Sequence, residues 1–127
     1  MNINIRDLIG VPYKVHGRGL DGLDCYGVVI EIYRMLGIKI PDYFYDDINP
    51  ETMKKLFTNG ECDYRLNVKK IEQPKMWCIV YFKLPKNNHL GVYVGEGKVI
   101  HSDQTFGVHI SDIRNFKNVI EGFYEYI

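Results

Sequence analysis

Apolar residues in the first third of the chain recur at a helical spacing. Between residues 25 and 36 they fall at positions i, i+3, i+4, i+7 and i+11, which places them on one face of a helix. The members of this face are Cys25, Val28, Val29, Ile32 and Leu36. Gly37 follows directly and predicts the end of the helix, and residues 3–9 predict a shorter helix before it.

From residue 76 onward the pattern becomes that of strands. Residues 76–84, MWCIVYFKL, are apolar on both faces, as in a buried strand. Residues 89–95 and 98–102 predict a hairpin, and residues 119–127 predict a closing strand. Because helices come first and antiparallel strands follow, the sequence predicts an α+β fold.

The length of 127 residues fits one domain, which we expect to cover residues 1–127. The stretch over residues 42–72 fits neither pattern and is interpreted as a helical insertion. Within it, residues 49–57 predict a short helix, because Asn49 is a good N-cap and Pro50 suits the first helical position.

A short link of glycines decides where two histidines, His89 and His101, lie in the predicted hairpin. A plain two-residue turn would leave them on opposite faces of the sheet. A three-residue loop, with Gly97 in the left-handed conformation, pairs Val94 with Lys98 and puts both histidines on one face. We expect the three-residue loop, which makes the histidines diagonal neighbours, so that one imidazole can orient the other.

Cys25 is the candidate nucleophile. It stands at the predicted helix start, where unpaired N–H groups and the helix dipole lower the pKa of a thiol. The glycine-rich loop before it, residues 16–24, lets the backbone approach a substrate. The alternative reading is that Cys25 is a small buried hydrophobe, as many free cysteines are.

Composition narrows the function classes. Sixteen basic and sixteen acidic residues give a net charge of zero, so nothing indicates a nucleic-acid partner or an anionic membrane. No apolar stretch approaches the roughly 20 residues of a membrane span, so we expect no membrane insertion. The first residues, MNINIRDLIG, lack the pattern of a secretory signal.

Three cysteines without CxxC spacing argue against a disulfide scaffold or a four-cysteine zinc site. Cys78, inside an apolar run, is expected in the core, and Cys62 is ambiguous. Cys25, His89 and His101 are residue types that bind zinc, but no fourth ligand is marked. We therefore expect no metal and no organic cofactor. His16 and His109 are interpreted as ordinary surface residues, the latter in a turn.

Two blocks of the sequence resemble the NlpC family of papain-like peptidases that cut bacterial cell-wall peptides. The first is GVPYKVHGRGLDGLDCYGVVIEIYRMLGIKIPDY, with a Pro-Tyr pair, a glycine-rich loop, an Asp-Cys pair and an amphipathic helix. The second is NHLGVYVGEGKVIHS, similar to the family's His-Val-Gly-Ile-Tyr hairpin with its final Ile-His. Together they cover about half of the chain in the family's order.

The resemblance implies a papain-like fold in which N-terminal helices, with the nucleophile at a helix start, pack on an antiparallel sheet. It implies Cys25 as nucleophile, His89 as general base and His101 as the residue that orients His89. It also implies that Tyr13 and Asp24 bind or shape the substrate site.

Tyr26 departs from the family pattern, which usually has Ser after the cysteine, and it alters the expected substrate subsite. Together with the Ile-Pro-Asp-Tyr stretch of residues 40–43, it is similar to the family branch found in phage tail proteins.

The function implied by the resemblance is hydrolysis of peptidoglycan stem peptides, between D-glutamate and the diamino acid, through a Cys-His-His triad. Two alternatives stay open: a phage tail-tip component for assembly or infection, and a non-catalytic module that binds wall peptides. The expected partners are the peptidoglycan peptide and, in the phage version, tail proteins. We expect synthesis in the cytoplasm without a signal peptide, followed by action in a virion tail or at the cell wall.

Overall fold

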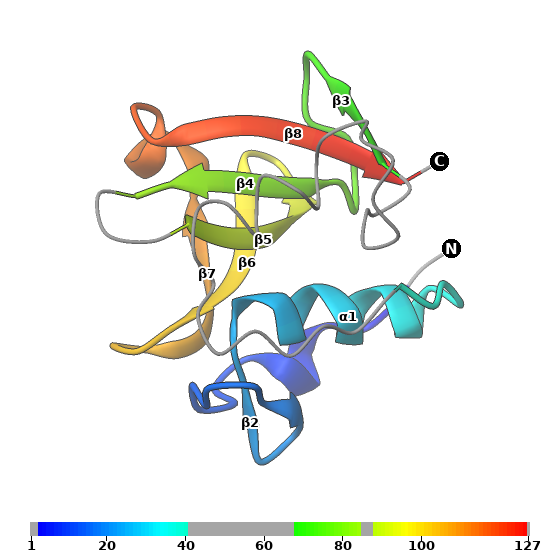
Figure 1. Ribbon diagram of the computed structural model, residues 1–127, viewed down its shortest axis with the longest axis vertical. Helices are drawn as coiled ribbons and strands as arrows, with labels where there is room; N and C mark the ends of the chain where they lie inside the picture. The colour runs from blue at the N-terminus through cyan, green and yellow to red at the C-terminus, as the bar shows by residue number, and fades with distance from the viewer. Residues whose placement is uncertain (1–2, 41–67, 85–87, 127) are drawn as a thin grey trace.

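The computed structural model describes residues 3–40, 68–84 and 88–126, and in this part of the chain one helix packs under an antiparallel sheet (Figure 1). The elements in chain order are the 3-10 helix η1 (Arg6–Leu8), β1 (Arg18–Gly19), β2 (Gly22–Leu23), α1 (Cys25–Met35), β3 (Val68–Ile71), β4 (Ile79–Lys83), β5 (Asn88–Gly95), β6 (Lys98–Asp103), β7 (Gly107–Asp112), the 3-10 helix η2 (Ile113–Phe116) and β8 (Ile120–Tyr126). This arrangement confirms the predicted α+β class.

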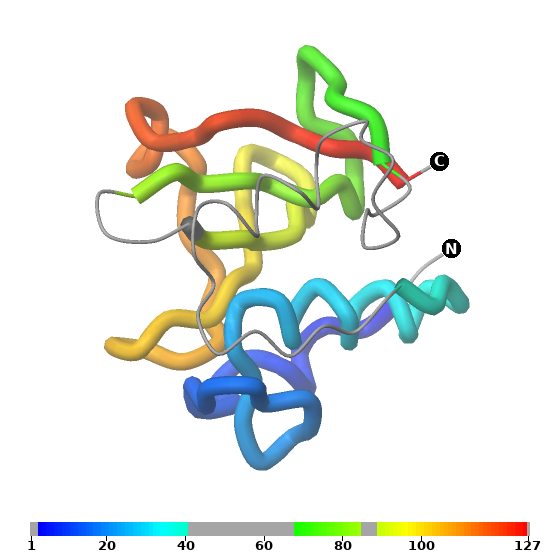
Figure 2. Tube along the Cα trace, viewed as in Figure 1, coloured from blue at the N-terminus to red at the C-terminus, as the bar shows by residue number. Residues whose placement is uncertain are grey.

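The main sheet has six strands in the order β3-β8-β4-β5-β6-β7, and every neighbouring pair is antiparallel. Helix α1 contacts β5 and β6 on one side and the small β1–β2 hairpin on the other. The tube in Figure 2 shows this layering, with α1 between the blue N-terminal segment and the sheet. The first turn of α1 and the start of β5 lie at the same end of the molecule (Figure 1).

Helix α1 follows the predicted pattern closely. Four of its five predicted face residues are buried, and the fifth, Leu36, is the half-buried C-cap. Gly37 ends the helix with φ of 81°, a conformation that glycine adopts without strain. With 11 residues, α1 is too short to cross a bilayer, and no helix in the described ranges is long and apolar enough to do so.

Each face of the sheet carries its own apolar cluster. The larger one fills the space between α1 and the sheet and includes Val28, Val29 and Ile32 of α1 with Ile79, Leu90, Val92 and Ile100 of the strands. The smaller one lies on the opposite face, where Val80, Phe82 and Val99 are buried beneath η2 and the residues after it. The central strands are therefore covered on both faces, which explains why residues 79–82 are apolar without alternation.

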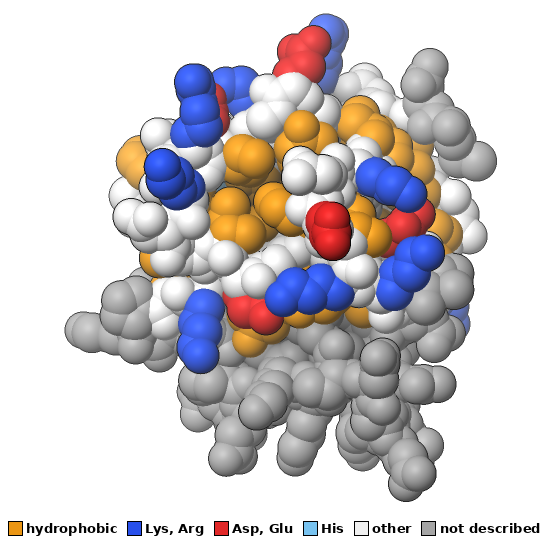
Figure 3. All heavy atoms as spheres, turned by 90° about the horizontal axis from the view of Figure 1, so that it is seen from above, with side chains coloured by type: hydrophobic (Ala, Val, Ile, Leu, Met, Phe, Trp, Pro, Cys, Tyr) orange, Lys and Arg blue, Asp and Glu red, His pale blue; other side chains and the backbone are white. Residues whose placement is uncertain are grey.

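The surface above β8 mixes both signs of charge around hydrophobic side chains (Figure 3). The ion pairs Lys70–Glu121 and Lys75–Glu125 belong to β8 and its neighbours. Alternating charges of this kind fit the net charge of zero and give no continuous basic surface on this face.

The β5–β6 hairpin places both histidines on one face, but by a different route from the predicted one. Gly95 pairs with Lys98 across a two-residue turn, so the predicted three-residue loop is wrong. A bulge at Val94 supplies the extra residue, because the register shifts between Tyr93 and Gly95. As a result His101 lies opposite Gly91, as expected.

Other boundaries differ for local reasons. Strand β4 begins at Ile79 rather than residue 76, because Trp77 has a left-handed φ of 71°, which interrupts the extended backbone just before the strand. His109 lies in β7, so its assignment to a turn is wrong. The predicted helix at 49–57 and Cys62 lie outside the described residues; of the predicted insertion at 42–72, Val68–Ile71 form β3.

Substitutions at the two turn residues of this hairpin should change the free energy of unfolding by different amounts. Glu96 and Gly97 both have positive φ, of 52° and 74°. Gly97→Val should lower the free energy of unfolding by about 1–2 kcal/mol, because a β-branched residue is strained in this region. Urea denaturation followed by circular dichroism measures the change. The control, Glu96→Gly, relieves a positive φ and should cost less; an equal loss from both would contradict the argument.

Candidate active site

A chain of contacts between β5, β6 and β7 forms the polar centre of the site. Nε2 of His89 lies 2.7 Å from Nδ1 of His101, and Nε2 of His101 lies 2.9 Å from Oγ of Ser111. His101 is only 2% exposed and packs among the rings of Phe82 and Phe116. The predicted contact between the two histidines is therefore confirmed, and Ser111 extends it by one residue.

Burial keeps both imidazoles neutral. It is the largest cause of the lowered pKa of His89, to about 4, and of His101, to about 3, and the neighbouring His109 lowers both further. The carboxylate of Asp103 acts in the opposite direction. A neutral His89 has one nitrogen free of a proton, which is the form a general base requires.

Cys25 meets this centre through the backbone of β5. It is the first residue of α1, is 5% exposed, and its sulfur accepts hydrogen bonds from the backbone N–H groups of Leu90 and Tyr26. Leu90 directly follows His89, so the thiol contacts the backbone of the residue next to the base candidate. The nucleophile candidate and the base candidate thus occupy the same end of the sheet.

From the sequence, the face of the sheet that carries the histidines is expected to pack toward the N-terminus of the 25–36 helix, but the structure turns it the other way. Leu90 and Ile100 face α1, whereas their strand neighbours His89 and His101 project from the other face, beside Phe82. The expectation that the histidine face packs toward the helix is therefore wrong. The helix start reaches the site at the backbone of β5 instead.

The thiol pKa also differs from expectation. Burial raises the pKa of Cys25 to about 12, and the charge of Asp24 adds to the rise. The hydrogen bonds from Leu90 and Tyr26 and the charge of Arg18 lower it, but by less. The resting pair is therefore a neutral thiol beside a neutral imidazole, because desolvation outweighs the field of the helix start.

Asp24 holds the glycine-rich loop over the helix start. Its Oδ1 accepts hydrogen bonds from Gly27 N at 2.7 Å, as the helix N-cap, and from Arg18 Nη1 at 2.7 Å. Its Oδ2 accepts from His16 N at 3.0 Å. The carboxylate is 2% exposed, so the helix start and the loop are fixed to one another by a single buried anion.

The two tyrosines assigned to substrate binding lie at different depths. Tyr13 is half-buried, and its pKa is raised mainly by burial and then by the nearby charges of Cys25 and Asp24, which places its hydroxyl close to the nucleophile. Tyr26 is 3% exposed, with the Arg18 guanidinium 5.7 Å from its ring centroid. Tyr13 is thus exposed enough to contact a ligand. Tyr26 is part of the hydrophobic core and is not exposed enough to do so.

A groove of about 630 Å³ runs beside Tyr13. Its walls are residues 10–15, apart from Val11, on one side and residues 104–107 on the other. Phe106 in the second wall is 70% exposed. The groove has room for several residues of an extended peptide, and Tyr13 is the candidate site residue that lines it.

Two close contacts hold β6 in place, one with the segment before α1 and one with β5. Ser102 Oγ donates a 2.7 Å hydrogen bond to the carbonyl of Leu23, two residues before Cys25. At Gly91 an added Cβ would lie 2.6 Å from Val99 Cγ2 and 2.9 Å from Ile100 O. Only glycine therefore allows β6 to approach β5 closely enough opposite His101.

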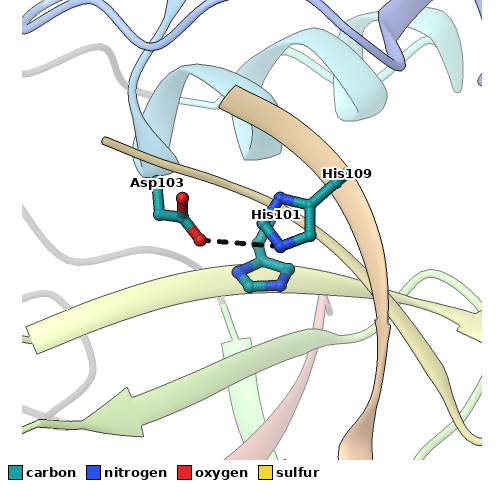
Figure 4. A group of neighbouring side chains, drawn as sticks. All are labelled: His101, Asp103 and His109. Atoms are coloured by element: carbon teal, nitrogen blue, oxygen red, sulfur yellow. Dashed lines mark ion pairs between the residues drawn. The ribbon is translucent and has the colours of Figure 1, made fainter. Parts of the chain in front are cut away.

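Three side chains of the site were not singled out from the sequence: Ser111, Asp103 and His109. His109 and Ser111 alternate along β7, and His109 pairs directly with His101 across the ladder. The sequence signal for His109 and Ser111 is the alternation of apolar and polar residues over 107–112. It was overlooked because His109 was interpreted as a turn residue. Figure 4 shows Asp103 and His109 beside the ring of His101, with the ion pair between them dashed.

The chain is similar to known proteins in sequence and in fold. The family described as NlpC/P60 matches residues 10–119. Among curated proteins, a probable peptidoglycan endopeptidase of Bacillus subtilis, LytE, is 27% identical over 110 residues, covering 85% of this chain and 28% of that protein. A probable endopeptidase of Haemophilus influenzae is 28% identical over 109 residues, covering 84% of this chain and 59% of that protein.

Among solved structures, an NlpC/P60 family protein from Bacillus cereus superposes with a TM-score of 0.67 at 23% identity. The match covers 94% of this chain and 36% of that one. The likeness confirms the predicted papain-like fold. This chain spans less than two thirds of the length of each of these three proteins.

The buried carboxylate of Asp24 predicts a large effect on stability. Asp24→Ala should lower the free energy of unfolding by about 3–5 kcal/mol, because it removes the buried carboxylate that pairs with Arg18 and caps the helix. Asp21→Ala is the matched control in the same loop: its pair with Lys14 is exposed, so the free energy should barely change. Urea titration measures both, and similar losses would show that the loop does not depend on Asp24.

Proposed function

The chain belongs to the NlpC/P60 family, and from this membership we propose that it is a cysteine endopeptidase that hydrolyses the stem peptides of peptidoglycan. The observation that supports the proposal is the 2.7 Å contact between His89 and His101, together with the hydrogen bond of the Cys25 thiol to the backbone of Leu90, the residue after His89. The two curated relatives, both named as probable endopeptidases, support the same reaction class.

The tautomers of the proposed triad follow from its contacts. His89 must keep one nitrogen free to take the thiol proton. Nε2 is engaged with His101, so the free nitrogen is Nδ1 and the proton of His89 sits on Nε2. His101 then accepts at Nδ1 and donates from Nε2 to Ser111. Ser111 thus helps to hold His101, and through it His89, in the form that acts as base.

Attack begins from the neutral pair. As Cys25 Sγ adds to the peptide carbonyl, its proton passes to Nδ1 of His89, which then delivers it to the leaving amine. The backbone N–H of Cys25, at the first helical position, is one of the donors a helix leaves unused and is suited to bind the oxyanion. Water then hydrolyses the thioester, with His89 again acting as base.

The substrate would lie in the groove beside Tyr13. Its walls offer the Tyr13 hydroxyl, the Lys14 ammonium and the exposed Phe106 ring. Stem peptides carry carboxylates, which the lysine would pair with, and aliphatic parts, which the ring would cover. The bond proposed for cleavage lies between D-glutamate and the diamino acid. Incubation of the purified protein with muropeptides, with mass spectrometry of the products, tests both the activity and the bond.

Substitution of the two histidines should separate their roles. His89→Ala should lower kcat by about 10²–10⁴-fold, because it removes the proton acceptor. His101→Asn should keep measurable activity, since its amide oxygen can accept from Nε2 of His89. His101→Ala offers no acceptor and should fall below His101→Asn. Muropeptide turnover measures all three, and wild-type rates in both alanine variants would remove the histidines from the mechanism.

Thiol alkylation gives a second test. Cys25 and Cys78 are both buried, and burial raises the pKa of each thiol. In the proposed triad His89 takes the proton of Cys25, whereas Cys78 has no assigned base. Iodoacetamide at neutral pH should therefore label Cys25 before Cys78, and His89→Ala should abolish the difference. Peptide mapping at early times measures the order. Equal labelling in the unmodified protein would contradict base assistance.

A further inference from the structure

Beside the histidine pair, Asp103, His109 and His101 offer ligand atoms that all lie within 4.8 Å of one another. Nδ1 of His109 lies 2.9 Å from the carbonyl of Gly107, and because a carbonyl only accepts, this nitrogen carries the proton. The lone pair of a neutral His109 is therefore on Nε2, and Nε2 faces Asp103 Oδ2 at 3.5 Å.

The carboxylate is fixed in the same way. Asp103 Oδ1 accepts hydrogen bonds from the backbone N–H groups of Thr105 and Phe106, at 2.9 and 2.8 Å. Oδ2 is left to face His109. Both side chains are thus oriented by backbone groups behind them, which is the arrangement that supports metal ligands in proteins.

The separation of the two atoms suits a small divalent cation. At 3.5 Å the separation of Nε2 of His109 and Oδ2 of Asp103 is longer than a normal hydrogen bond. Bonds of about 2.0–2.1 Å at a tetrahedral angle separate two ligand atoms by about 3.3–3.5 Å, the spacing of a zinc site. Imidazole and carboxylate are both zinc ligands, and His101 supplies the third.

Access favours binding at this cluster rather than deeper in the site. The side chains of His109 and Asp103 are 25% and 36% exposed, so an ion can reach them from solvent. His101 below them is almost fully buried, with its ring centroid 4.3 Å from that of His109 (Figure 4). A fourth position is open to water on the exposed side.

We propose that Asp103, His109 and His101 form a zinc site whose occupancy switches off the base of the peptidase. Coordination at Nε2 of His101 moves the proton of that ring to Nδ1, which then donates to His89. His89 must accept at Nε2 and carry its own proton on Nδ1, toward the thiol, so each ring keeps one proton but the base is lost. Coordination at Nδ1 of His101 instead removes the acceptor that orients His89.

The binding part of this proposal is tested by isothermal titration calorimetry with zinc chloride. The Cys25→Ser protein removes the thiol as a competing ligand and should bind one zinc ion. Cys25→Ser/His109→Phe keeps an aromatic ring against His101 and should bind more than about tenfold more weakly. The matched control, Cys25→Ser/His16→Asn, removes a histidine outside the cluster and should bind as Cys25→Ser does. Equal affinities in all three proteins would overturn the site.

The switching part rests on the peptidase function proposed above. Zinc should inhibit muropeptide cleavage by the wild-type protein, and EDTA should restore it. Inhibition is measured against each protein's own rate without zinc, and His109→Phe should resist it. Equal inhibition of both proteins would overturn the switch and place the ion at the Cys25 thiol. If neither protein cleaves muropeptides, the proposed peptidase function is wrong. The calorimetric titration still tests the zinc site in that case.

Discussion

The chemistry of this site depends on the register of β5 against β6. A strand has a period of two, so one residue more or less between His89 and His101 would send their side chains to opposite faces. The bulge at Val94 supplies that residue, and Gly91 lets the strands approach where His101 must lie. The 2.7 Å contact between the two imidazoles therefore depends on the backbone register of β5 and β6.

A second constraint is the competition between burial and charge at the helix start. The carboxylate of Asp24 binds Arg18 of the loop and caps the helix. Its negative charge lies near the thiol and raises the pKa of Cys25, so it does not favour loss of the thiol proton. Burial then keeps both Cys25 and His89 neutral at rest. The proposed reaction therefore develops its charge only as bonds form, and the groove beside Tyr13 would bring the substrate to an uncharged pair.

The spacing of apolar residues was enough to predict the elements that depend on it alone. The helix over Cys25–Met35 and the central strands follow from apolar spacing, and Gly37 ends the helix as glycine should. The sequence could not separate a three-residue loop from a two-residue turn with a bulge, because both give the same register and both use Gly97 at positive φ. His109 and Ser111 were missed because the alternation around them was interpreted as a turn, and because their role depends on the pairing of β7 with β6. The pKa of Cys25 depends on burial, which only the assembled fold determines.

The hydrogen bond from Ser102 to Leu23 joins residues 79 positions apart. Contacts of such long sequence separation close late in folding, because the loop entropy must be overcome before they contribute. During synthesis the helix carrying the thiol leaves the ribosome well before β5 and β6 exist. A nascent or partly folded chain therefore holds the candidate nucleophile without its candidate base. The proposed activity would arise only in the finished molecule, because the chain order delays the base.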